Sequence, residues 1–428
     1  MTRRPRMVVA WLTSLAVGLL LSGCGGDESG VTTLRFWAMG REGEVVQELV
    51  HDFEAQHPDI RVTVQQIPWS AAHEKLLTAF VGRSMPDMAQ LGNTWVPEFT
   101  ALDALTPLDA WVAASPAVDP ADHFPGIWDT NVIEGQLYGV PWYVDTRVIY
   151  YRTDLLRQAG FDHFPRTWTG WMKAMQEVTE QGGPDRYAIL LPLNEWSQPV
   201  TLALETGSAL LKDHHTRGDF SGRAFAQAFD FYTHIFAEGW SPPVSNNEIA
   251  NLYQEFGRGT FAMYISGPWN LGEFRRRLPA ALQDSWGTAP LPGLTDARPG
   301  MSLAGGSSLV VFRTSEHQEA ARKLMAFLLD PVQQIRFYEL TGDLPSHREA
   351  WNDTRLANDP RAAAFRTQLE YTRATPKIPE WEQIANRIWV AVEEAVRGNK
   401  TEEEALRDLD EDVDRMLTKR RWLLEKEN

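Results

Sequence analysis

The chain is predicted to form an α/β fold with two lobes, and three observations lead to this prediction. Its 428 residues are more than one hydrophobic core usually holds, so two lobes are expected. Some segments alternate apolar and polar residues, whereas others repeat apolar residues at helical spacing. These strand and helix patterns follow one another in β-α-β order, which predicts mostly parallel sheets with helices on their faces.

The first 23 residues resemble an export signal. Arginines precede an apolar run from Met7 to Leu21, which is too short for a typical membrane span of about 20 residues. The alternative interpretation is a buried N-terminal helix. Residues 21–24 resemble the lipobox of bacterial lipoproteins, and this resemblance implies cleavage before Cys24 and acylation of its thiol. Cys24 is the single cysteine of the sequence, so no internal disulfide is expected.

Residues 24–30 are small and polar, which is typical of a flexible tether between a lipid and a folded domain. Without the first 23 residues the chain keeps 38 basic and 57 acidic residues, a net charge of about −19. This charge argues against nucleic acid or an anionic membrane surface as a partner. The 17 tryptophans exceed what a core of this size needs and favour a carbohydrate ligand over other ligands.

The predicted elements begin near residue 34. Leu34 to Trp37 form a predicted strand, and apolar residues from Val45 to Phe53 then recur at helical spacing. Residues 60–64 alternate as a half-buried strand, which ends at Pro68. Later helices begin at recognisable caps, which are Thr167, Ser315 with Gln318, Asp330 before Pro331, and Thr401 with Glu404. Gly342 follows the end of the helix that starts at Pro331.

Five predicted strands each lead into a tryptophan beside a polar or charged residue. In an open parallel sheet, ligands bind beyond the carboxyl ends of the strands. Any one of these tryptophans taken singly is more often a core residue than a ligand contact, but packing alone hardly explains five in corresponding places. The candidate ligand-binding residues at these strand ends are Trp37 with Arg41 and Glu42, Asn93 with Trp95, Trp142 with Tyr143, Asp145 and Arg147, Glu195 with Trp196, and Trp269 with Asn270.

The chemistry of these residues suits a sugar. Carboxylates and carboxamides bond to vicinal hydroxyls, arginine can bridge two hydroxyls, and aromatic rings cover the C–H face. Glycines at 40, 43, 305 and 306 would let the backbone approach a ligand closely. The Gly305-Gly306-Ser307-Ser308 segment is equally compatible with a simple crossover bend.

Several segments, taken in order, resemble the sugar-binding branch of the extracellular solute-binding proteins of bacterial ABC importers. The similarity covers nearly all of the chain after the signal and is greatest to the trehalose/maltose-binding type. The segments that carry it are Phe36-Trp37 with Gly40 and Glu42, Pro86 to Met88, Trp95 to Phe99, Leu137 to Asp145, Tyr150 to Leu155, Thr167-Trp168, Gly259 to Met263 and Gly267 to Trp269.

This resemblance implies a type II periplasmic-binding-protein fold, whose two lobes are joined by two or three hinge segments. Residues 31–144 and 303–345 would form the N-terminal lobe, and residues 145–302 and 346–428 the C-terminal lobe. The lobes would close on a disaccharide or short oligosaccharide, and the chain would deliver it to the membrane subunits of an importer. A monomer without cofactor or metal is expected, lipid-anchored and facing the periplasm or the cell exterior.

The resemblance also implies particular contacts. Glu42, Asn93, Tyr143, Asp145 and Trp269 fall where the family places ligand contacts. Position 93 is often an aspartate in the trehalose/maltose type, so Asn93 leaves the exact sugar open. Residues 344–348 match a stretch at the cleft edge, which makes Arg348 a further candidate contact.

Two other classes of protein fit parts of the sequence less well. Glu42 and Asp145 could serve as the paired carboxylates of an exported glycoside hydrolase. The resemblance, however, is to a family without catalytic activity, and the acids are already accounted for as acceptors for hydroxyl groups. A structural or adhesive lipoprotein would not require tryptophans at so many strand ends. No motif indicates a metal or nucleotide site.

Overall fold

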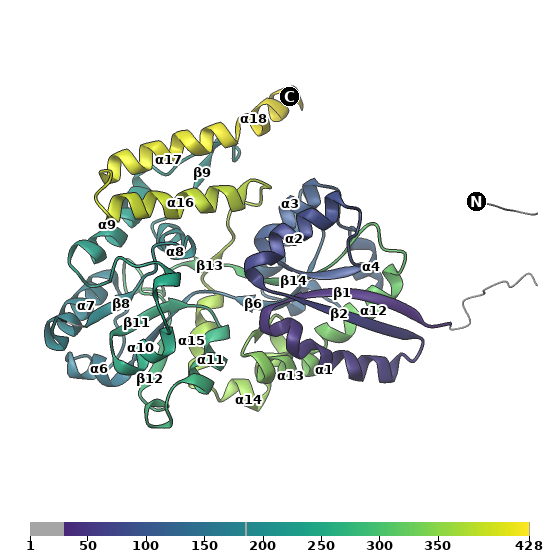
Figure 1. Cartoon of the computed structure of the whole chain (residues 1–428), viewed down its shortest axis with the longest axis horizontal. Coiled ribbons are helices and arrows are strands. Elements are labelled where there is room, and N and C mark those ends of the chain that lie inside the picture. The colour runs from purple at the N-terminus through teal and green to yellow at the C-terminus, as the bar shows by residue number, and fades with distance from the viewer. Residues whose placement is uncertain (1–29, 185, 428) are drawn as a thin grey trace, which may run out of the picture.

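Two α/β lobes form the computed structural model, which describes residues 30–184 and 186–427 (Figure 1). The predicted signal at 1–23 and the candidate lipidation site Cys24 lie outside the described residues, as does all of the predicted tether except Gly30. Within the described part of the chain, no helix is long and apolar enough to cross a membrane. The predicted two-lobed α/β fold is confirmed.

The N-terminal lobe is built on a six-stranded sheet of order β15-β6-β14-β3-β1-β2. Its strands are β1 (Thr32–Met39), β2 (Ile60–Ile67), β3 (Met88–Gly92), β6 (Val140–Asp145), β14 (Gly305–Val311) and β15 (Leu344–Pro345). The helices around it are α1 (Gly40–Gln56), α2 (Trp69–Val81), α3 (Val96–Ala101), α4 (Asp109–Ala114), α5 (Pro125–Asp129), α12 (Gln318–Leu329) and α13 (Pro331–Thr341). Short elements complete the lobe: the 3-10 turns η1 (Asn93–Trp95) and η2 (Pro120–Asp122), and the hairpin of β4 (Val132–Ile133) and β5 (Gln136–Leu137).

The C-terminal lobe is built on a four-stranded sheet of order β12-β7-β11-β8. Its strands are β7 (Val148–Arg152), β8 (Tyr187–Leu190), β11 (Phe261–Ser266) and β12 (Trp286–Ala289). Its helices are α6 (Thr153–Gln158), α7 (Trp168–Gly182), α8 (Ser197–Glu205), α9 (Arg223–Ala237), α10 (Leu252–Arg258), α11 (Trp269–Arg277), α14 (Thr354–Ala357), α15 (Pro360–Leu369), α16 (Trp381–Val396), α17 (Glu402–Met416) and α18 (Thr418–Glu427). Smaller elements are β9 (Leu211–Lys212) with β10 (Arg217–Gly218), β13 (Ser302–Leu303) with β16 (Thr372–Arg373), and the turns η3 (Asn246–Glu248), η4 (Ala280–Leu282) and η5 (Arg348–Asn352).

The sheets are mixed, so the prediction of mostly parallel sheets is wrong in this detail. Strand β1 pairs parallel with β2 and β3, but β14 runs antiparallel to both β3 and β6. In the other lobe β11 is parallel to β8 and antiparallel to β7. A β-α-β order predicts parallel pairing only for strands joined by a crossover within one sheet. Strands β14 and β7 each enter their sheet from the other lobe, and this entry reverses their direction.

The chain passes between the lobes three times. Strand β6 of one sheet leads directly to β7 of the other, β13 leads to β14, and β15 leads to η5. A hydrophobic cluster at these crossings contains residues from both lobes, among them Val144, Tyr150, Leu271 and Leu344. We propose that the lobe boundaries follow these passages, at 144/145, 302/303 and 345/346.

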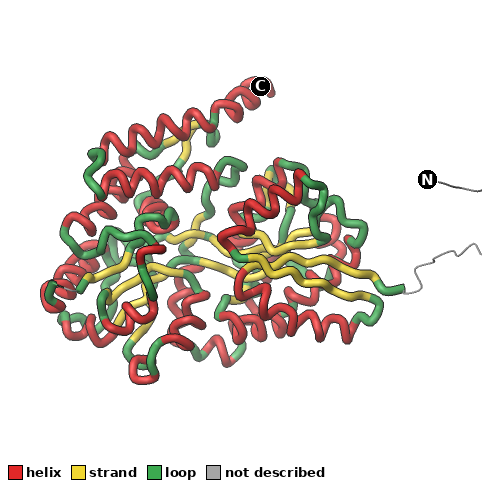
Figure 2. The backbone as a smooth tube through the Cα atoms, viewed as in Figure 1, coloured by secondary structure: helices red, strands yellow, loops and turns green. Residues whose placement is uncertain are grey.

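Helices cover both faces of the N-terminal sheet (Figure 2). In β1 the alternating residues Leu34, Phe36 and Ala38 pack on one face with α1 and α12. Met39 packs on the opposite face with α2 and α3. Successive side chains of a strand therefore lie on opposite faces of the sheet, so neighbouring aromatic residues in one strand face different surroundings.

The predicted caps are confirmed with one exception. The Thr167 hydroxyl accepts from the Gly170 amide (3.1 Å), and Thr401 with Glu404 forms a capping box. Asp330 caps α13, which ends at Gly342 in the left-handed conformation. The exception is Ser315: helix α12 begins at Gln318, and the Ser315 hydroxyl instead donates to Asp87 (2.8 Å). The same hydroxyl accepts from the His317 amide (3.0 Å), so Ser315 forms a local turn before the helix and not the predicted capping box.

Candidate functional site

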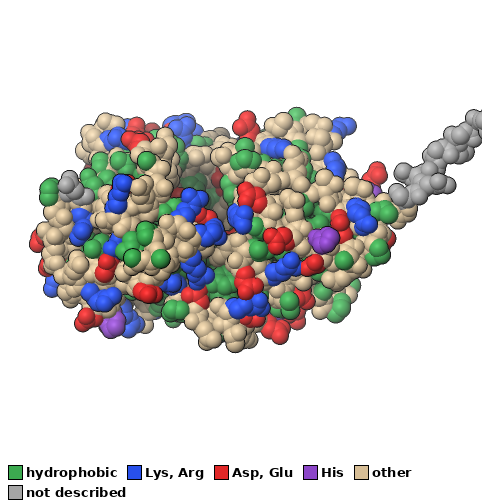
Figure 3. Space-filling model, turned by 60° about the horizontal axis from the view of Figure 1, so that its bottom comes forward, with side chains coloured by type: hydrophobic (Ala, Val, Ile, Leu, Met, Phe, Trp, Pro, Cys, Tyr) green, Lys and Arg blue, Asp and Glu red, His purple; other side chains and the backbone are tan. Residues whose placement is uncertain are grey.

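A cleft of about 610 Å³ lies between the lobes and is lined by residues of both. The surface of the molecule is hollowed between the two lobes in the space-filling view (Figure 3). The predicted site residues that line the cleft are Arg41, Glu42, Asn93, Trp95, Tyr143, Asp145, Arg147, Trp196, Trp269, Gly305 and Gly306. Segments distant in sequence are therefore gathered around one concave site, as is typical of small-molecule binding.

The N-terminal wall of the cleft is centred on Glu42, in the first turn of α1. This side chain is only 7% exposed. Its Oε1 accepts a hydrogen bond from the Tyr143 hydroxyl at 2.7 Å, and the Gln90 amide donates to the same hydroxyl at 3.0 Å. Gln90 is fixed in turn by the Met39 amide, which donates to its Oε1 at 2.8 Å. The wall is thus a buried polar network in which each group orients the next.

Burial raises the pKa of the Glu42 carboxyl, although hydrogen bonds from its own backbone, Tyr143, Trp69 and Gln90 oppose this shift. Burial also raises the pKa of Asp343 well above its usual value, and the charge of Glu42 raises it further. Ionising both of two neighbouring buried carboxyls is unfavourable, because their charges repel each other and neither is well solvated. The pair can therefore donate as well as accept hydrogen bonds, as a ligand rich in hydroxyl groups requires.

Close backbone approach also shapes this wall. The Asn93 amide donates to the backbone oxygen of Ala304 at 3.0 Å, which fixes Asn93 at the end of β3. Gly305 and Gly306 begin β14 and pair with Asp145 and Val144 of β6. Gly306 has a φ of +144°, and a Cβ atom there would lie 2.3 Å from the Tyr143 backbone oxygen. The segment is therefore a strand start beside the cleft and not a crossover bend.

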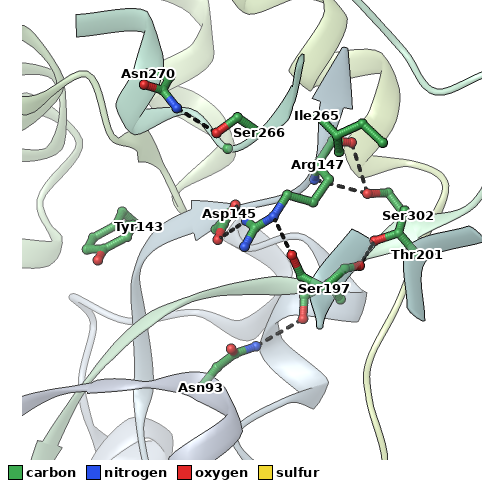
Figure 4. Close-up of polar contacts among 12 residues, drawn as sticks. Asn93, Tyr143, Asp145, Arg147, Ser197, Thr201, Ile265, Ser266, Asn270 and Ser302 are labelled. Atoms are coloured by element: carbon green, nitrogen blue, oxygen red, sulfur yellow. Dashed lines mark hydrogen bonds and ion pairs between the residues drawn. The ribbon is translucent and has the colours of Figure 1, made fainter. Parts of the chain in front are cut away.

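The C-terminal wall begins with the ion pair of Asp145 and Arg147. The Arg147 Nη1 lies 2.6 Å from the Asp145 Oδ1, and its Nε donates to the Ser197 hydroxyl at 3.3 Å. Figure 4 shows the Arg147 side chain pointing toward both partners. The same guanidinium lies over the Trp269 ring, 4.9 Å from its centroid. Arg147 is thereby held with its donors beside the cleft.

Exposed tryptophans complete the cleft. Trp269 begins α11 and stays 37% exposed, and its ring covers Gly267, where any Cβ atom would clash with it. Trp69 begins α2, is 38% exposed and meets Trp95 edge-on at 5.6 Å. Large exposed rings at a concave site offer stacking surfaces for a ligand.

Two predicted tryptophans lie elsewhere. Trp142 is 1% exposed and stacks on Phe337 with ring centroids 4.4 Å apart, so it belongs to the core behind the cleft. Trp37 lies inside β1, where Lys75 covers its ring at 4.8 Å. Both lie within strands that are longer than predicted, and alternation along a strand turns them away from the cleft.

Four other predicted residues support the site from behind. Gly40 has a φ of +51° and leaves room for Trp69, which a Cβ atom would approach to 2.7 Å. Glu195 accepts from Ser197 (2.7 Å), the partner of Arg147. Asn270 accepts from the Tyr253 hydroxyl (2.9 Å), and Ser307 donates to the backbone of β3.

Arg348 does not reach the cleft. Its guanidinium lies over the Phe124 ring, 5.4 Å from the centroid. The predicted contact set thus divides into residues on the cleft, residues behind it and one residue that is remote from it.

Several residues that line the cleft are not among the predicted contacts. Trp69 directly follows β2 and Pro68, so the strand-end pattern that selected the other tryptophans would have found it. The other side chains come mainly from helices and loops, where no comparable signal exists: Tyr253, Glu273, Arg277, Thr341, Asp343, Thr375 and Glu382. In the described ranges, no three His, Cys, Asp or Glu side chains are grouped so as to hold a metal ion.

Comparison with known proteins gives consistent matches over most of the chain. Residues 38–335 match the family model described as bacterial extracellular solute-binding protein. The structure of the sugar-binding protein MalE from Xanthomonas citri is 51% identical, with a TM-score of 0.88, over 93% of this chain and 100% of that one. An ABC transporter solute-binding protein from Thermotoga lettingae, solved with α-D-tagatose bound, is 26% identical, with a TM-score of 0.79, over 90% of this chain and 100% of that one. The diacetylchitobiose-binding protein DasA from Streptomyces coelicolor is 24% identical over 89% of this chain and 91% of its own length.

Proposed function

This chain belongs to the bacterial extracellular solute-binding proteins, and we propose that it captures a small sugar for an ABC importer. The ligand class is a disaccharide or short oligosaccharide, of which the trehalose/maltose type is the first candidate. One observation carries the proposal: a cleft between two lobes combines buried hydrogen-bonding groups with exposed tryptophan rings, Trp69 on the N-terminal wall and Trp269 on the C-terminal wall.

A sugar matches both walls. Its C–H faces can stack on Trp269 and Trp69, while its hydroxyls can bond to Glu42 and to the Asp145–Arg147 pair. The lobes would close around the ligand, because contacts to both walls stabilise the closed form over the open one. The relatives support this ligand class, because two of them are named as binding proteins for sugars and the third was solved with a sugar bound.

The proposed function is tested by binding without turnover. The full-length chain, purified in detergent, is titrated by calorimetry with maltose, trehalose, sucrose and short glucans. At least one sugar should bind saturably in the micromolar range or tighter, at about −8 kcal/mol or better. Chromatography should detect no product. Cleavage that Glu42→Gln or Asp145→Asn abolishes would instead establish a glycoside hydrolase.

We also propose that the protein is exported and anchored as a monomer through lipid on Cys24. Stable attachment needs more than one acyl chain, so several chains on this residue are expected. The wild type should partition with membranes, and Cys24→Ser should leave an unprocessed or soluble protein. Wild-type protein recovered wholly in the soluble fraction would refute the anchor without touching the sugar proposal.

A further inference from the structure

A second hollow, of about 510 Å³, opens beside the cleft. It lies on the C-terminal lobe, where α10 and the end of α11 meet (Figure 1). Two residues, Tyr253 of α10 and Arg277 of α11, line both the hollow and the cleft. The two concave surfaces therefore adjoin each other, with Tyr253 and Arg277 at their boundary. The other residues that line the hollow are Asn251, Gln254, Gly257, Arg258 and Pro279.

The side chains at this boundary are held in place. The Arg277 guanidinium lies over the Tyr253 ring, 5.0 Å from its centroid, and its Nε donates to the Glu273 carboxylate. The Tyr253 hydroxyl donates to the Asn270 Oδ1 at 2.9 Å, and the Tyr253 and Phe274 rings meet edge to face. The Arg277 side chain is nevertheless 57% exposed. The boundary is thus a preformed surface that a ligand can reach.

The lining of the hollow is polar but not strongly charged. Its two arginines are each paired with a carboxylate, Arg277 with Glu273 and Arg258 with Glu255 at 3.1 Å. Gln254 is exposed and adds an uncharged amide. An anionic ligand would compete with the two carboxylates for the arginines. A hydroxyl group can instead donate to a carboxylate or accept from a guanidinium or an amide. The lining therefore suits the hydroxyl groups of a sugar.

Gly257 keeps the hollow open. It lies within α10, and glycine in a helix is less favourable than alanine because it loses more conformational freedom on folding. The surrounding structure does not require a glycine, since a Cβ atom at 257 would make only ordinary contacts, the nearest with Leu282 at 3.6 Å. Folding thus gives no reason for glycine at this position, whereas a ligand in the hollow does.

We propose that the hollow is a subsite for a further sugar unit, so that the preferred ligand is an oligosaccharide of three or more units. This inference rests on the proposed function, since the first units would occupy the cleft. The sugar chain would cross the boundary at Tyr253 and Arg277, and its next unit would lie over Gly257 within reach of Gln254. The subsite selects ligands by length, because a disaccharide in the cleft does not extend into it.

The subsite is tested by calorimetric titration of the full-length chain with maltose, trehalose, maltotriose and maltotetraose. Wild type should bind at least one longer sugar roughly tenfold tighter than either disaccharide, the gain expected from about two added hydrogen bonds. Gly257→Leu fills the hollow with a good helix former and should remove this gain without changing disaccharide affinity. Gly257→Ala adds only a methyl group and should keep most of the gain.

A second pair of variants removes a hydrogen-bonding group instead of filling space. Gln254→Ala should weaken binding of the longer sugars by roughly threefold to tenfold, the loss of about one hydrogen bond, and leave disaccharide binding unchanged. Its matched control is Gln176→Ala, an exposed glutamine on α7, which should bind every sugar as wild type does. Thermal unfolding followed by circular dichroism checks that each variant is folded.

The outcomes separate the subsite from the proposed function. If the disaccharides bind and the longer sugars bind no tighter, the subsite is wrong and the proposed function stands. A preference for longer sugars that both Gly257→Leu and Gln254→Ala retain would also overturn the subsite. If none of the four sugars binds, the proposed ligand class and the subsite are both wrong.

Discussion

The two walls of the cleft are built differently. On the N-terminal wall, Glu42, Tyr143 and Gln90 are buried and hydrogen-bonded to one another. On the C-terminal wall, Trp269 is 37% exposed and held by the Arg147 guanidinium above it and Gly267 below. The network on the first wall is buried throughout, whereas the second wall combines a largely buried ion pair with an exposed ring.

This difference predicts separable effects of mutation. Damage to the N-terminal wall leaves buried polar groups without partners and should lower the free energy of unfolding. Damage to the C-terminal wall removes a stacking surface and should lower affinity alone. Four substitutions test this contrast, beginning with the one that should change the protein most.

Trp142→Ala should lower the free energy of unfolding more than any other of these substitutions, because this core residue supports the N-terminal wall from behind. Removing a buried ring that stacks on Phe337 should lower the free energy of unfolding by about 3 to 5 kcal/mol. Urea denaturation followed by circular dichroism measures the loss. Trp142→Phe keeps a ring in the core and should lose clearly less. A variant as stable as wild type would show that the ring is not part of the packed core.

Trp269→Ala should weaken binding of the sugar found in the panel by about 2 to 4 kcal/mol, by analogy with aromatic hot spots. Its free energy of unfolding should hardly change, since the ring is partly exposed. Small-angle scattering should show wild type compacting on binding, with the variant needing far more ligand. Trp422→Ala, an exposed tryptophan on α18, is the control. Normal binding with early melting would place Trp269 in the core.

Tyr143→Phe should lower the free energy of unfolding by about 1 to 3 kcal/mol, because Glu42 and Gln90 lose their shared buried partner. Affinity should fall as well, so both readouts move together on this wall. The matched control is Tyr138→Phe, whose hydroxyl bonds to Gln136 at an exposed position. Equal losses in the two variants would contradict a special role for the buried network.

Glu42→Gln should have the smallest effect, a change in how stability depends on pH. Burial raises the folded-state pKa of Glu42 above 4.5, so the folded chain keeps a proton that the unfolded chain has released. Stability therefore falls as the pH rises from 4.5 toward that pKa. Glu42→Gln should flatten this fall, and Glu44→Gln, exposed on the same helix, should not. Denaturation midpoints across the pH range measure the slope.

The ends of the predicted strands mark most of the cleft, and the exceptions have a physical cause. Strand β1 was predicted to end near Trp37, but pairing with β2 continues to Met39. Likewise β6 continues to Asp145 because β14 and β15 pair along it. Strand length depends on the partner strands, which a local pattern does not contain. Trp37 and Trp142 therefore lie inside strands and face away from the cleft, whereas the side chain of Tyr143 lines the cleft.

Local patterns in the amino-acid sequence are enough to predict the two-lobed α/β class, most helix caps and the strands that lead to Glu42, Asn93, Asp145 and Trp269. These follow from local periodicity and capping chemistry, which act over a few residues. Two other features depend on the tertiary structure: Asp343 lies close enough to Glu42 for their charges to interact, and the Thr94 hydroxyl donates to Glu382. Such contacts join residues hundreds of positions apart through sheet pairing and lobe packing, so no local pattern encodes them.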